Sequence, residues 1–210
     1  MFTVHHLGKS QSERIVWLCE ELDIAYELKH YARAPVMAPD DYRALHPVGS
    51  APVITDGGVT LAESGAVVEW IIAKHGNGRL TVPQDDPAFA EYLYWFHFAN
   101  GTLQPAFMRL MISSRLNAPE DHPALKLGQQ RMQRILAMME ARLGTVPYLA
   151  GEFSAADIMT VFSLTTMRHF QPYDLSPYPN ILRYLARIGA RPAYQRAMQK
   201  GDPEMDLLLG

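Results

Sequence analysis

Hydrophobic positions in the first part of the chain predict two strands with a helix between them. Residues 1–7, MFTVHHL, are rich in strand formers, and residues 24–31 alternate between apolar and polar side chains from Ile24 onward. The intervening segment repeats apolar residues at the spacing of one helical face. These positions are Ile15, Leu18, Cys19 and Leu22.

A hairpin and a second helix follow in the same part of the chain. Residues 51–64 contain two short strand-like segments joined at Asp56, Gly57 and Gly58, which is a hairpin turn signal. The next segment, SGAVVEWIIAKHG, predicts a helix that ends at Gly76. The resulting order of elements predicts a small α/β sandwich with a mixed sheet.

The second part of the chain predicts only helices. Prolines, glycines and acidic residues in NGRLTVPQDDP mark a linker, and we expect a domain boundary near residues 77–86. The long aromatic segment at residues 87–112 should be buried on several sides and kinked at Asn100-Gly101 and Pro105. Further helical patterns occupy residues 122–144, 154–170 and 180–199. The first of these has its apolar stripe at Met132, Ile135, Leu136 and Met139.

The composition is typical of a soluble globular protein. The 210 residues are 48% hydrophobic and 20% charged, and a formal net charge of -3 gives no electrostatic basis for binding nucleic acid or an anionic membrane. No apolar stretch approaches the roughly 20 residues of a membrane span, and we expect no signal peptide. The single cysteine, Cys19, rules out an internal disulfide framework and favours a reducing cytoplasm.

No motif in the sequence indicates a metal or phosphate site. His5 and His6 lie in a predicted strand and should point to opposite faces, which is unsuitable for chelation. The chain contains no CxxC pair and no glycine-rich phosphate loop. Because Cys19 falls on the apolar face of its helix, we expect a buried and unreactive thiol.

One serine–aspartate pair carries folding information. Ser154 and Asp157 have the spacing of a capping box, with aspartate in place of the usual glutamate. Phe153 and Ile158 occupy the two positions of a hydrophobic staple around it. We therefore expect a helix to begin at this point.

Three other motifs allow both a structural and a chemical interpretation. Pro52, taken alone, is expected to be an ordinary trans proline at a strand edge, because only about 5–6% of such bonds are cis. Glu63 and Ser64 either cap a helix or bind an amino-acid head group, through the carboxylate and through the hydroxyl with nearby N–H groups respectively. Ser10 and Glu13 have capping-box spacing, yet a hydroxyl at a helix start also suits an anion.

Taken in order, these segments resemble the cytosolic glutathione transferases, in particular serine-type, bacterial-like members. The resemblance covers nearly the whole chain and is carried by SERIVWLCEEL, HPVGSAPVI, AES, FSAADI and YPNILRYLARIGARPAYQRAM. It implies an α+β fold with a thioredoxin-like, glutathione-binding domain over residues 1–78, a linker at 79–86 and an all-helical domain over 87–210. It also implies a cytoplasmic homodimer with its active sites near the subunit interface.

The resemblance implies which residues bind glutathione. Ala51 precedes a proline, Pro52, that is cis in the family, and the Ala51 backbone would pair with the cysteinyl part of glutathione. Glu63 and Ser64 match the pair that binds the γ-glutamyl end. Ser50 stands where a Lys or Gln that touches glutathione is common, and its side chain is shorter.

The thiol-activating residue follows from the same comparison. In serine-type members it stands four residues before the arginine of the first helix, which is Arg14 here and points to Ser10. Ser12 is the alternative. A hydroxyl near a helix start can donate to a thiolate where the helix end also favours negative charge.

The expected function is conjugation of the glutathione thiolate, as co-substrate, to small hydrophobic electrophiles, without a metal. The alternatives are glutathione-dependent peroxide reduction, isomerisation or dehalogenation, and a non-catalytic member that acts through protein contacts. We expect the acceptor pocket between the domains. Its residues would be Leu7, Gly8, Phe107, Met108 and Met111.

Overall fold

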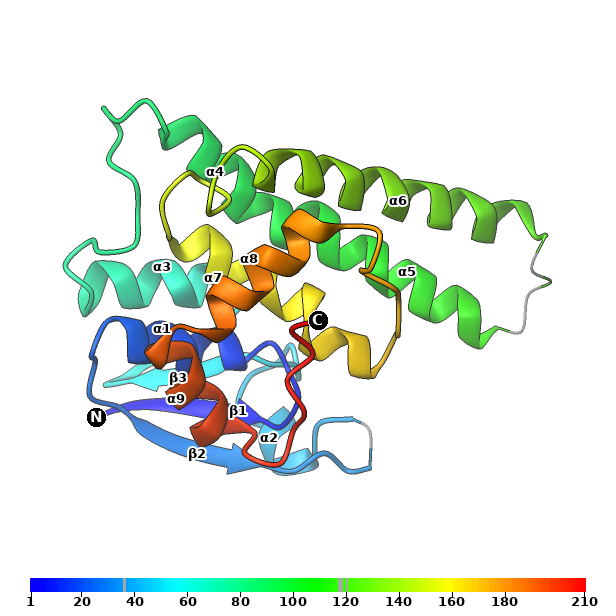
Figure 1. Cartoon of the computed structure of the whole chain (residues 1–210). Helices are drawn as coiled ribbons and strands as arrows, with labels where there is room; N and C mark the ends of the chain where they lie inside the picture. The colour runs from blue at the N-terminus through cyan, green and yellow to red at the C-terminus, as the bar shows by residue number, and fades with distance from the viewer. Residues whose placement is uncertain (36, 117–118, 120) are drawn as a thin grey trace. The chain divides into compact units, whose positions relative to one another are not determined.

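The computed structural model describes every residue except 36, 117–118 and 120. The chain divides into two compact units (Figure 1). The first comprises Met1–Thr81 together with Gly189–Leu207, and the second comprises Val82–Ile188 together with Leu208–Gly210. Residues 189–207 therefore belong to the first unit, whereas the sequence pattern assigned them to the helical domain.

A four-stranded mixed sheet forms the centre of the first unit, as the sequence predicts. Its strands are β1 (Phe2–Leu7), β2 (Glu27–Tyr31), β3 (Val53–Asp56) and β4 (Val59–Ala62), in the order β2-β1-β3-β4. β1 pairs with β2 in parallel and with β3 antiparallel, and β3 and β4 form the predicted hairpin. Gly57, with φ of +60°, occupies the hairpin turn in a conformation that glycine adopts without strain.

One strand begins later than the alternating pattern indicates. The pattern starts at Ile24, but β2 begins at Glu27. The Ile24 N–H bonds to the Cys19 carbonyl, and Asp23 has φ of +52°, so these residues complete the exit from the preceding helix. Local hydrogen bonds at the helix end thus take precedence over the apolar alternation.

Four helices accompany the sheet, and they are α1 (Glu13–Glu21), α2 (Asp40–Arg43), α3 (Ser64–Lys74) and α9 (Pro192–Gly201). The predicted apolar face of α1 is fully buried. α9 packs along α1, where the rings of Trp17 and Tyr194 lie 4.9 Å apart and Arg191 forms an ion pair with Glu21 at 2.7 Å. This packing fixes the end of α9, Gly201, beside β1.

The regular elements of the second unit, within its described residues, are helices, apart from two isolated bridges around residues 148–152. Its segments are α4 (Phe89–Phe98), a π-helical stretch (Ala99–Leu103), α5 (Gln104–Arg115), α6 (Pro123–Leu143), α7 (Ala155–Leu164), a 3₁₀ turn (Thr166–His169) and α8 (Pro179–Gly189). In Figure 1, α5 and α6 run side by side. All four predicted stripe residues of α6 are buried.

The long aromatic segment is interrupted at the predicted place and is partly exposed. Asn100 and Gly101 lie in a π-helical stretch between α4 and α5, so the interruption takes the form of a wider helical turn. Burial is also incomplete, because Leu93, Tyr94 and Ile112 remain 40%, 49% and 53% exposed.

No helix within the described residues is both long and apolar enough to cross a membrane.

The capping box predicted at the start of α7 is confirmed. Ser154 is the N-cap residue, its hydroxyl accepts from the Ala156 N–H, and Asp157 accepts from the Ser154 N–H at 2.9 Å. Both side chains are buried. The capping box therefore satisfies the N–H groups of Ser154 and Ala156 at this helix start.

Candidate functional site

The sheet brings three loops to one edge. β1 ends at Leu7, β3 begins at Val53 and β4 ends at Ala62, and the register pairs Val53 with both His5 and Ala62. Since β3 is antiparallel to both neighbours, the loops that follow β1, precede β3 and follow β4 all leave the same edge. These loops carry Ser10–Ser12, Ser50–Pro52 and Glu63–Ser64 respectively.

The loop after β1 buries both candidate serines. Ser10 is 4% exposed and Ser12 is fully buried. Their hydroxyl oxygens lie 2.7 Å apart, and Ser10 Oγ also accepts from the Ser12 N–H at 3.2 Å. Ser12 Oγ accepts from the Leu7 N–H at 3.1 Å and lies 3.0 Å from His6 Nδ1.

This arrangement argues against the capping interpretation of Ser10. Helix α1 begins at Glu13 with Ser12 as N-cap, and the Ser12 side chain makes no capping bond. The Ser10 hydroxyl bonds to Ser12, while the Glu13 N–H bonds to the Ser10 carbonyl. The capping box suggested by the Ser10–Glu13 spacing is therefore not formed, and the Ser10 hydroxyl retains capacity for a further hydrogen bond.

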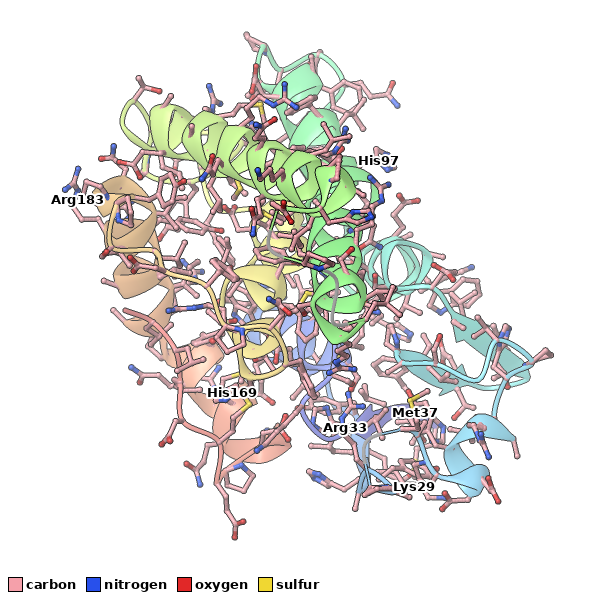
Figure 2. The ribbon with its side chains drawn as sticks, turned by 90° about the vertical axis from the view of Figure 1, so that its right-hand side faces the viewer. Lys29, Arg33, Met37, His97, His169 and Arg183 are labelled. Carbon is pink, nitrogen blue, oxygen red and sulfur yellow. The ribbon has the colours of Figure 1, made fainter. Side chains whose placement is uncertain are left out.

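Hydrogen bonds from a distant arginine fix the backbone of the loop after β1. Arg33, labelled in Figure 2, donates to the carbonyls of Gly8 and Lys9 at 2.8 and 2.9 Å. Lys9 has φ of +51°, a left-handed conformation that is uncommon for a residue with a side chain. Such a conformation persists where surrounding contacts determine it, and here these contacts fix the position of Ser10.

The loop before β3 contains a cis peptide bond between Ala51 and Pro52. The trans bond expected from Pro52 alone is wrong, and the cis bond implied by the family resemblance is present. Ala51 is buried together with Leu7 and Ala62 in one apolar cluster, which ties this loop to the other two. Ser50 is exposed.

Glu63 and Ser64 form the turn between β4 and α3. Glu63 is the N-cap residue but makes no side-chain capping bond, and its φ is +68°. Ser64 is the first residue of the helix, so it is not the capping residue. An exposed glutamate with a positive φ, directly before the first N–H groups of a helix, has a strained backbone of the kind that clusters at functional sites, and such N–H groups suit an anion.

A buried arginine connects the first helix to this turn. Arg14 donates to Ser64 Oγ at 3.1 Å and to Gln11 Oε1 at 2.8 Å. Burial lowers the pKa of Arg14 to about 9, which still leaves the guanidinium protonated at neutral pH. Arg14 therefore connects Gln11, in the loop after β1, to Ser64 and places a buried positive charge next to both.

The structure reveals two residues that sequence reasoning did not assign to the site. His6 lies on the opposite face of β1 from His5, as predicted, and its Nε2 lies 3.1 Å from Asp202 Oδ2. Asp202 follows α9 and accepts from the Lys9 N–H at 3.0 Å. The available signal was a carboxylate at the C-terminal end of a helix, where the helix dipole disfavours negative charge.

The proposed acceptor residues belong partly to each unit. Leu7 is 3% exposed within the apolar cluster, and Gly8 is half-buried. Phe107 is buried with its ring 4.3 Å from that of Tyr173. Met108 is exposed and Met111 is half-buried.

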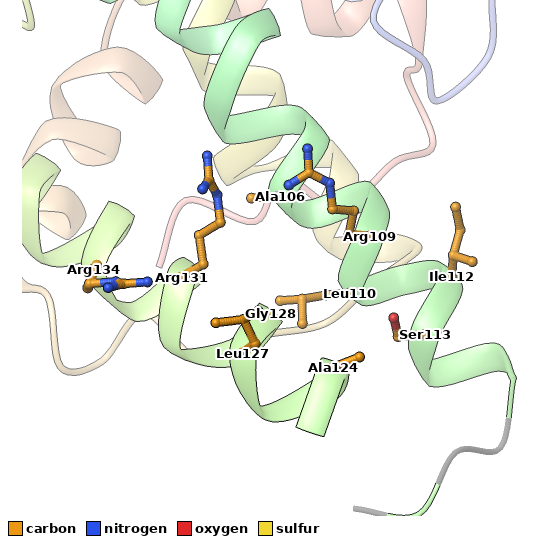
Figure 3. Close-up of a pocket in the computed structure, with 10 residues that line it drawn as sticks. All are labelled: Ala106, Arg109, Leu110, Ile112, Ser113, Ala124, Leu127, Gly128, Arg131 and Arg134. Atoms are coloured by element: carbon orange, nitrogen blue, oxygen red, sulfur yellow. The ribbon is translucent and has the colours of Figure 1, made fainter. Parts of the chain in front are cut away.

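A groove of about 420 Å³ lies between α5 and α6 in the second unit (Figure 3). Three arginines line it, Arg109, Arg131 and Arg134, together with apolar side chains such as Leu110 and Leu127. Met108 and Met111 do not line it. This groove therefore differs from the acceptor pocket predicted from the sequence.

The thiol of Cys19 takes no part in the site. It is fully buried, and burial raises its pKa well above the ordinary value, so the expected unreactive thiol is confirmed. Among the described residues, no cluster of histidine, cysteine, aspartate and glutamate could hold a metal ion.

Comparison with known proteins identifies the family. Residues 10–74 match the model of the glutathione S-transferase N-terminal domain, and residues 98–192 match that of the C-terminal domain. Glutathione S-transferase 3 of Schizosaccharomyces pombe is 31% identical over 95% of this chain and 88% of its own length. The chain therefore belongs to the glutathione S-transferase family.

Solved structures agree with this result. A glutathione S-transferase from Actinobacillus pleuropneumoniae has 30% sequence identity and a TM-score of 0.87, covering 96% of this chain and 93% of its own. A theta class enzyme from Xanthomonas axonopodis pv. citri, solved with glutathione bound, has 28% identity and a TM-score of 0.72, covering 93% and 96%. The predictions of a glutathione transferase and of a thioredoxin-like domain followed by a helical one are confirmed.

Proposed function

We propose that this protein transfers the glutathione thiolate to small hydrophobic electrophiles. The observation that supports the proposal most directly is the meeting of three loops at one sheet edge. The buried Ser10 hydroxyl offers a hydrogen-bond partner for the thiol. The loop with the cis proline offers a backbone that can pair with a peptide, and the glutamate at the helix start offers an acceptor for an ammonium group. The three match the thiol, the cysteinyl backbone and the γ-glutamyl ammonium of glutathione.

The γ-glutamyl and cysteinyl parts of glutathione then each have a proposed partner. Glu63 accepts from the γ-glutamyl ammonium, while Ser64 and the first N–H groups of α3 bind the carboxylate beside it. The Ala51 backbone pairs with the cysteinyl part, and Ser50 contributes a weaker polar contact. This set holds the thiol near Ser10.

Ser10 and the start of α1 provide enough stabilisation to ionise the thiol. A free thiol with a pKa of about 8.5 must be lowered by roughly 1.5–2 units to be mostly thiolate at neutral pH, which corresponds to about 2–3 kcal/mol. A hydrogen bond to the anion contributes about 1.5–3 kcal/mol and a helix start about 0.3–1 kcal/mol more. No metal is needed for this activation.

Binding is tested by calorimetric titration with glutathione. Glu63→Gln should raise the dissociation constant about tenfold or more, since it leaves the ammonium without its counter-charge, and tenfold corresponds to about 1.4 kcal/mol. Glu69→Gln is the matched control, because Glu69 is exposed on the same helix. Equal affinity in wild type and Glu63→Gln would remove Glu63 from the site.

Turnover is tested with a model aryl halide and a panel of peroxides. Conjugation faster than peroxide reduction supports the transferase over the peroxidase alternative. Glutathione binding without any turnover would identify a non-catalytic member of the family. Leu7, Gly8, Phe107, Met108 and Met111 remain the proposed acceptor contacts, and substitutions there should change electrophile preference without changing glutathione affinity.

We extend the proposal to a homodimer in the cytoplasm. Leu93, Tyr94 and Ile112 leave apolar surface on the helical unit, which favours burial against a second copy. Light scattering at micromolar concentration should give twice the monomer mass of 23.6 kDa. A monomer mass would contradict this extension and leave the transferase proposal intact.

A further inference from the structure

A buried hydrogen-bonded chain runs from Asp202 through His6 and Ser12 to Ser10. The successive distances are 3.1 Å from Asp202 Oδ2 to His6 Nε2, 3.0 Å from His6 Nδ1 to Ser12 Oγ and 2.7 Å from Ser12 Oγ to Ser10 Oγ. His6 is only 1% exposed. The chain ends at the hydroxyl proposed to contact the glutathione thiol.

We propose that His6 and Asp202 are positioning residues for Ser10, and that His6 receives the thiol proton through the two serine hydroxyls. The proposal rests on the function proposed above and assigns the fate of the proton in that reaction. Neither residue touches glutathione, so both act through Ser12 and Ser10.

The backbone around this chain is built for close approach. A Cβ atom on Gly201 would lie 3.2 Å from the His6 ring, and one on Gly8 would lie 3.3 Å from Asp202 Oδ1. Two glycines thus allow the end of α9 and the loop after β1 to approach the His6–Asp202 hydrogen bond closely. The Lys9 N–H also donates to Asp202 at 3.0 Å, which fixes the carboxylate.

The position of Asp202 is electrostatically unfavourable for the helix that carries it. Asp202 is the C-cap residue of α9, where the exposed carbonyls disfavour a carboxylate. Burial favours a raised pKa for Asp202, but hydrogen bonds from His6 and the Lys9 N–H outweigh it and leave the pKa below its ordinary value. Asp202 is therefore ionised at neutral pH, and its partner is His6.

The direction of each hydrogen bond follows from the carboxylate. An ionised carboxylate only accepts, so His6 Nε2 donates to Asp202. With that tautomer, Nδ1 accepts from the Ser12 hydroxyl at 3.0 Å, which is closer than the Leu7 carbonyl, the other acceptor for this proton at 3.3 Å. Ser12 has a single proton, so the 2.7 Å bond between the two serines is donated by Ser10. In this state the Ser10 oxygen can accept a proton from a thiol but cannot donate to a thiolate.

Ionisation of the thiol reverses the whole chain. The S–H bond breaks and its proton bonds to Ser10 Oγ, the Ser10 proton passes to Ser12 Oγ, and the Ser12 proton passes to His6 Nδ1. No electron is transferred to an outside group, and the charges produced are a thiolate and an imidazolium. Ser10 now donates outward to the thiolate, and Asp202 stabilises the imidazolium.

Three basic side chains act on the His6–Asp202 pair. The ring of His30 on β2 meets the His6 ring edge-on at 5.7 Å, and the Lys9 and Arg33 side chains act electrostatically on Asp202. Lys9 and Arg33 are cationic, whereas burial, together with the charge of His6, lowers the pKa of His30. The Asp202 carboxylate is the group that offsets these positive charges.

The first test is titration of the thiolate absorbance of bound glutathione against pH. Asp202→Asn should raise the thiol pKa by about one unit or more and lower kcat/KM at neutral pH about tenfold, with recovery at higher pH. Glutathione affinity should stay within about twofold, since Asp202 does not touch glutathione. His6→Asn should give the same shift.

His5→Asn is the matched control. His5 is a buried neighbour on the same strand whose ring bonds to Tyr31 and Thr55, with no connection to Ser10. It should leave the thiolate titration unchanged even if it destabilises the fold. An equal shift in His5→Asn and Asp202→Asn would show a general structural effect and overturn the relay.

The second test uses the wild-type protein, so that misfolded variants cannot obscure the result. Calorimetry in buffers of different ionisation enthalpy counts the protons released when glutathione binds. If His6 keeps the thiol proton, fewer protons than thiolates should appear in the buffer. Release of one proton for every thiolate would overturn the proposal.

Failure of the relay is distinguishable from failure of the proposed function. Wild type that forms thiolate normally, together with an Asp202→Asn variant of unchanged thiol pKa, would overturn only the relay. Wild type that binds no glutathione would overturn the proposed function and the relay with it.

Discussion

Two serine–aspartate networks, one in each unit, use the same residue types for different ends. At the start of α7, Asp157 accepts from the N–H groups of Ser154 and Leu149 and from the Tyr184 hydroxyl, at 2.9, 3.1 and 3.0 Å. All these donors are buried, and the carboxylate is fully enclosed. Ser154 and Asp157 stand only three positions apart, so the helix start itself brings them together.

The network in the first unit is assembled from distant parts of the chain. His6 and Asp202 are separated by 196 positions, and the chain of bonds continues through Ser12 to Ser10. Ser10 makes its side-chain bonds only to Ser12 among the described residues. A network whose donors and acceptors are all used stabilises the fold, whereas one that ends in a hydroxyl with capacity for a further hydrogen bond is available for chemistry.

The largest effect should follow removal of the enclosed carboxylate. Asp157→Ala leaves the Ser154 and Leu149 N–H groups and the Tyr184 hydroxyl buried without an acceptor, at about 1–3 kcal/mol each before relaxation. We expect the free energy of unfolding, measured by denaturant titration, to fall by roughly 3–5 kcal/mol. Asp174→Ala, on the surface of the same unit, should have little effect, and similar losses in both would contradict this role.

The pH dependence of the same residue should be the next largest effect. Burial raises the pKa of Asp157 from 3.8 to about 6 despite its hydrogen bonds. Because the folded pKa lies above the unfolded one, the folded state favours the neutral acid. The stability it contributes is complete below pH about 4 and is lost as the pH rises through about 6, a difference of about 3 kcal/mol.

Asp157→Asn isolates this contribution. The unfolding free energy of wild type relative to Asp157→Asn should decrease between pH about 4 and pH about 7. A difference that stays constant over this range would show that Asp157 titrates elsewhere.

Ser10→Ala should separate activity from stability. Conjugation activity at neutral pH should fall about tenfold or more, equivalent to about 1.4 kcal/mol of transition-state stabilisation. Stability should fall by only about 1 kcal/mol, because the Ser12 N–H loses its acceptor. Ser12→Ala tests the alternative donor, and a thiolate titration shifted only in Ser12→Ala would reverse the assignment of the two serines.

Ser154→Ala should have the smallest effect of these substitutions. In contrast to Ser10→Ala, it should change stability without changing activity. It removes a helix cap and should lower stability by about 1 kcal/mol. Its activity, measured under conditions where the protein is fully folded, should equal that of wild type. A loss of activity comparable with that of Ser10→Ala would erase the distinction between the two networks.

Local sequence patterns predicted the elements well where hydrogen bonds connect near neighbours. The β3–β4 hairpin and the Ser154–Asp157 capping box follow from turn and cap residues within a few positions. The start of β2 was placed too early, because apolar alternation cannot show that Ile24 is bonded back to Cys19. The candidate site residues Ser10, Glu63 and Pro52 were proposed from motif order, although their local patterns alone favoured caps or an ordinary proline.

The sequence by itself determined the order of strands and helices, the burial of Cys19 and the positions of the serine, proline and glutamate loops, since these depend on periodicity and short-range motifs. Only the tertiary structure decided that Ser10 is not a cap and that Asp202 meets His6. The reason is physical: a hydroxyl or carboxylate bonds to whatever polar group the fold brings within about 3 Å. Here the packing of α9 on α1 supplies that group from the far end of the chain.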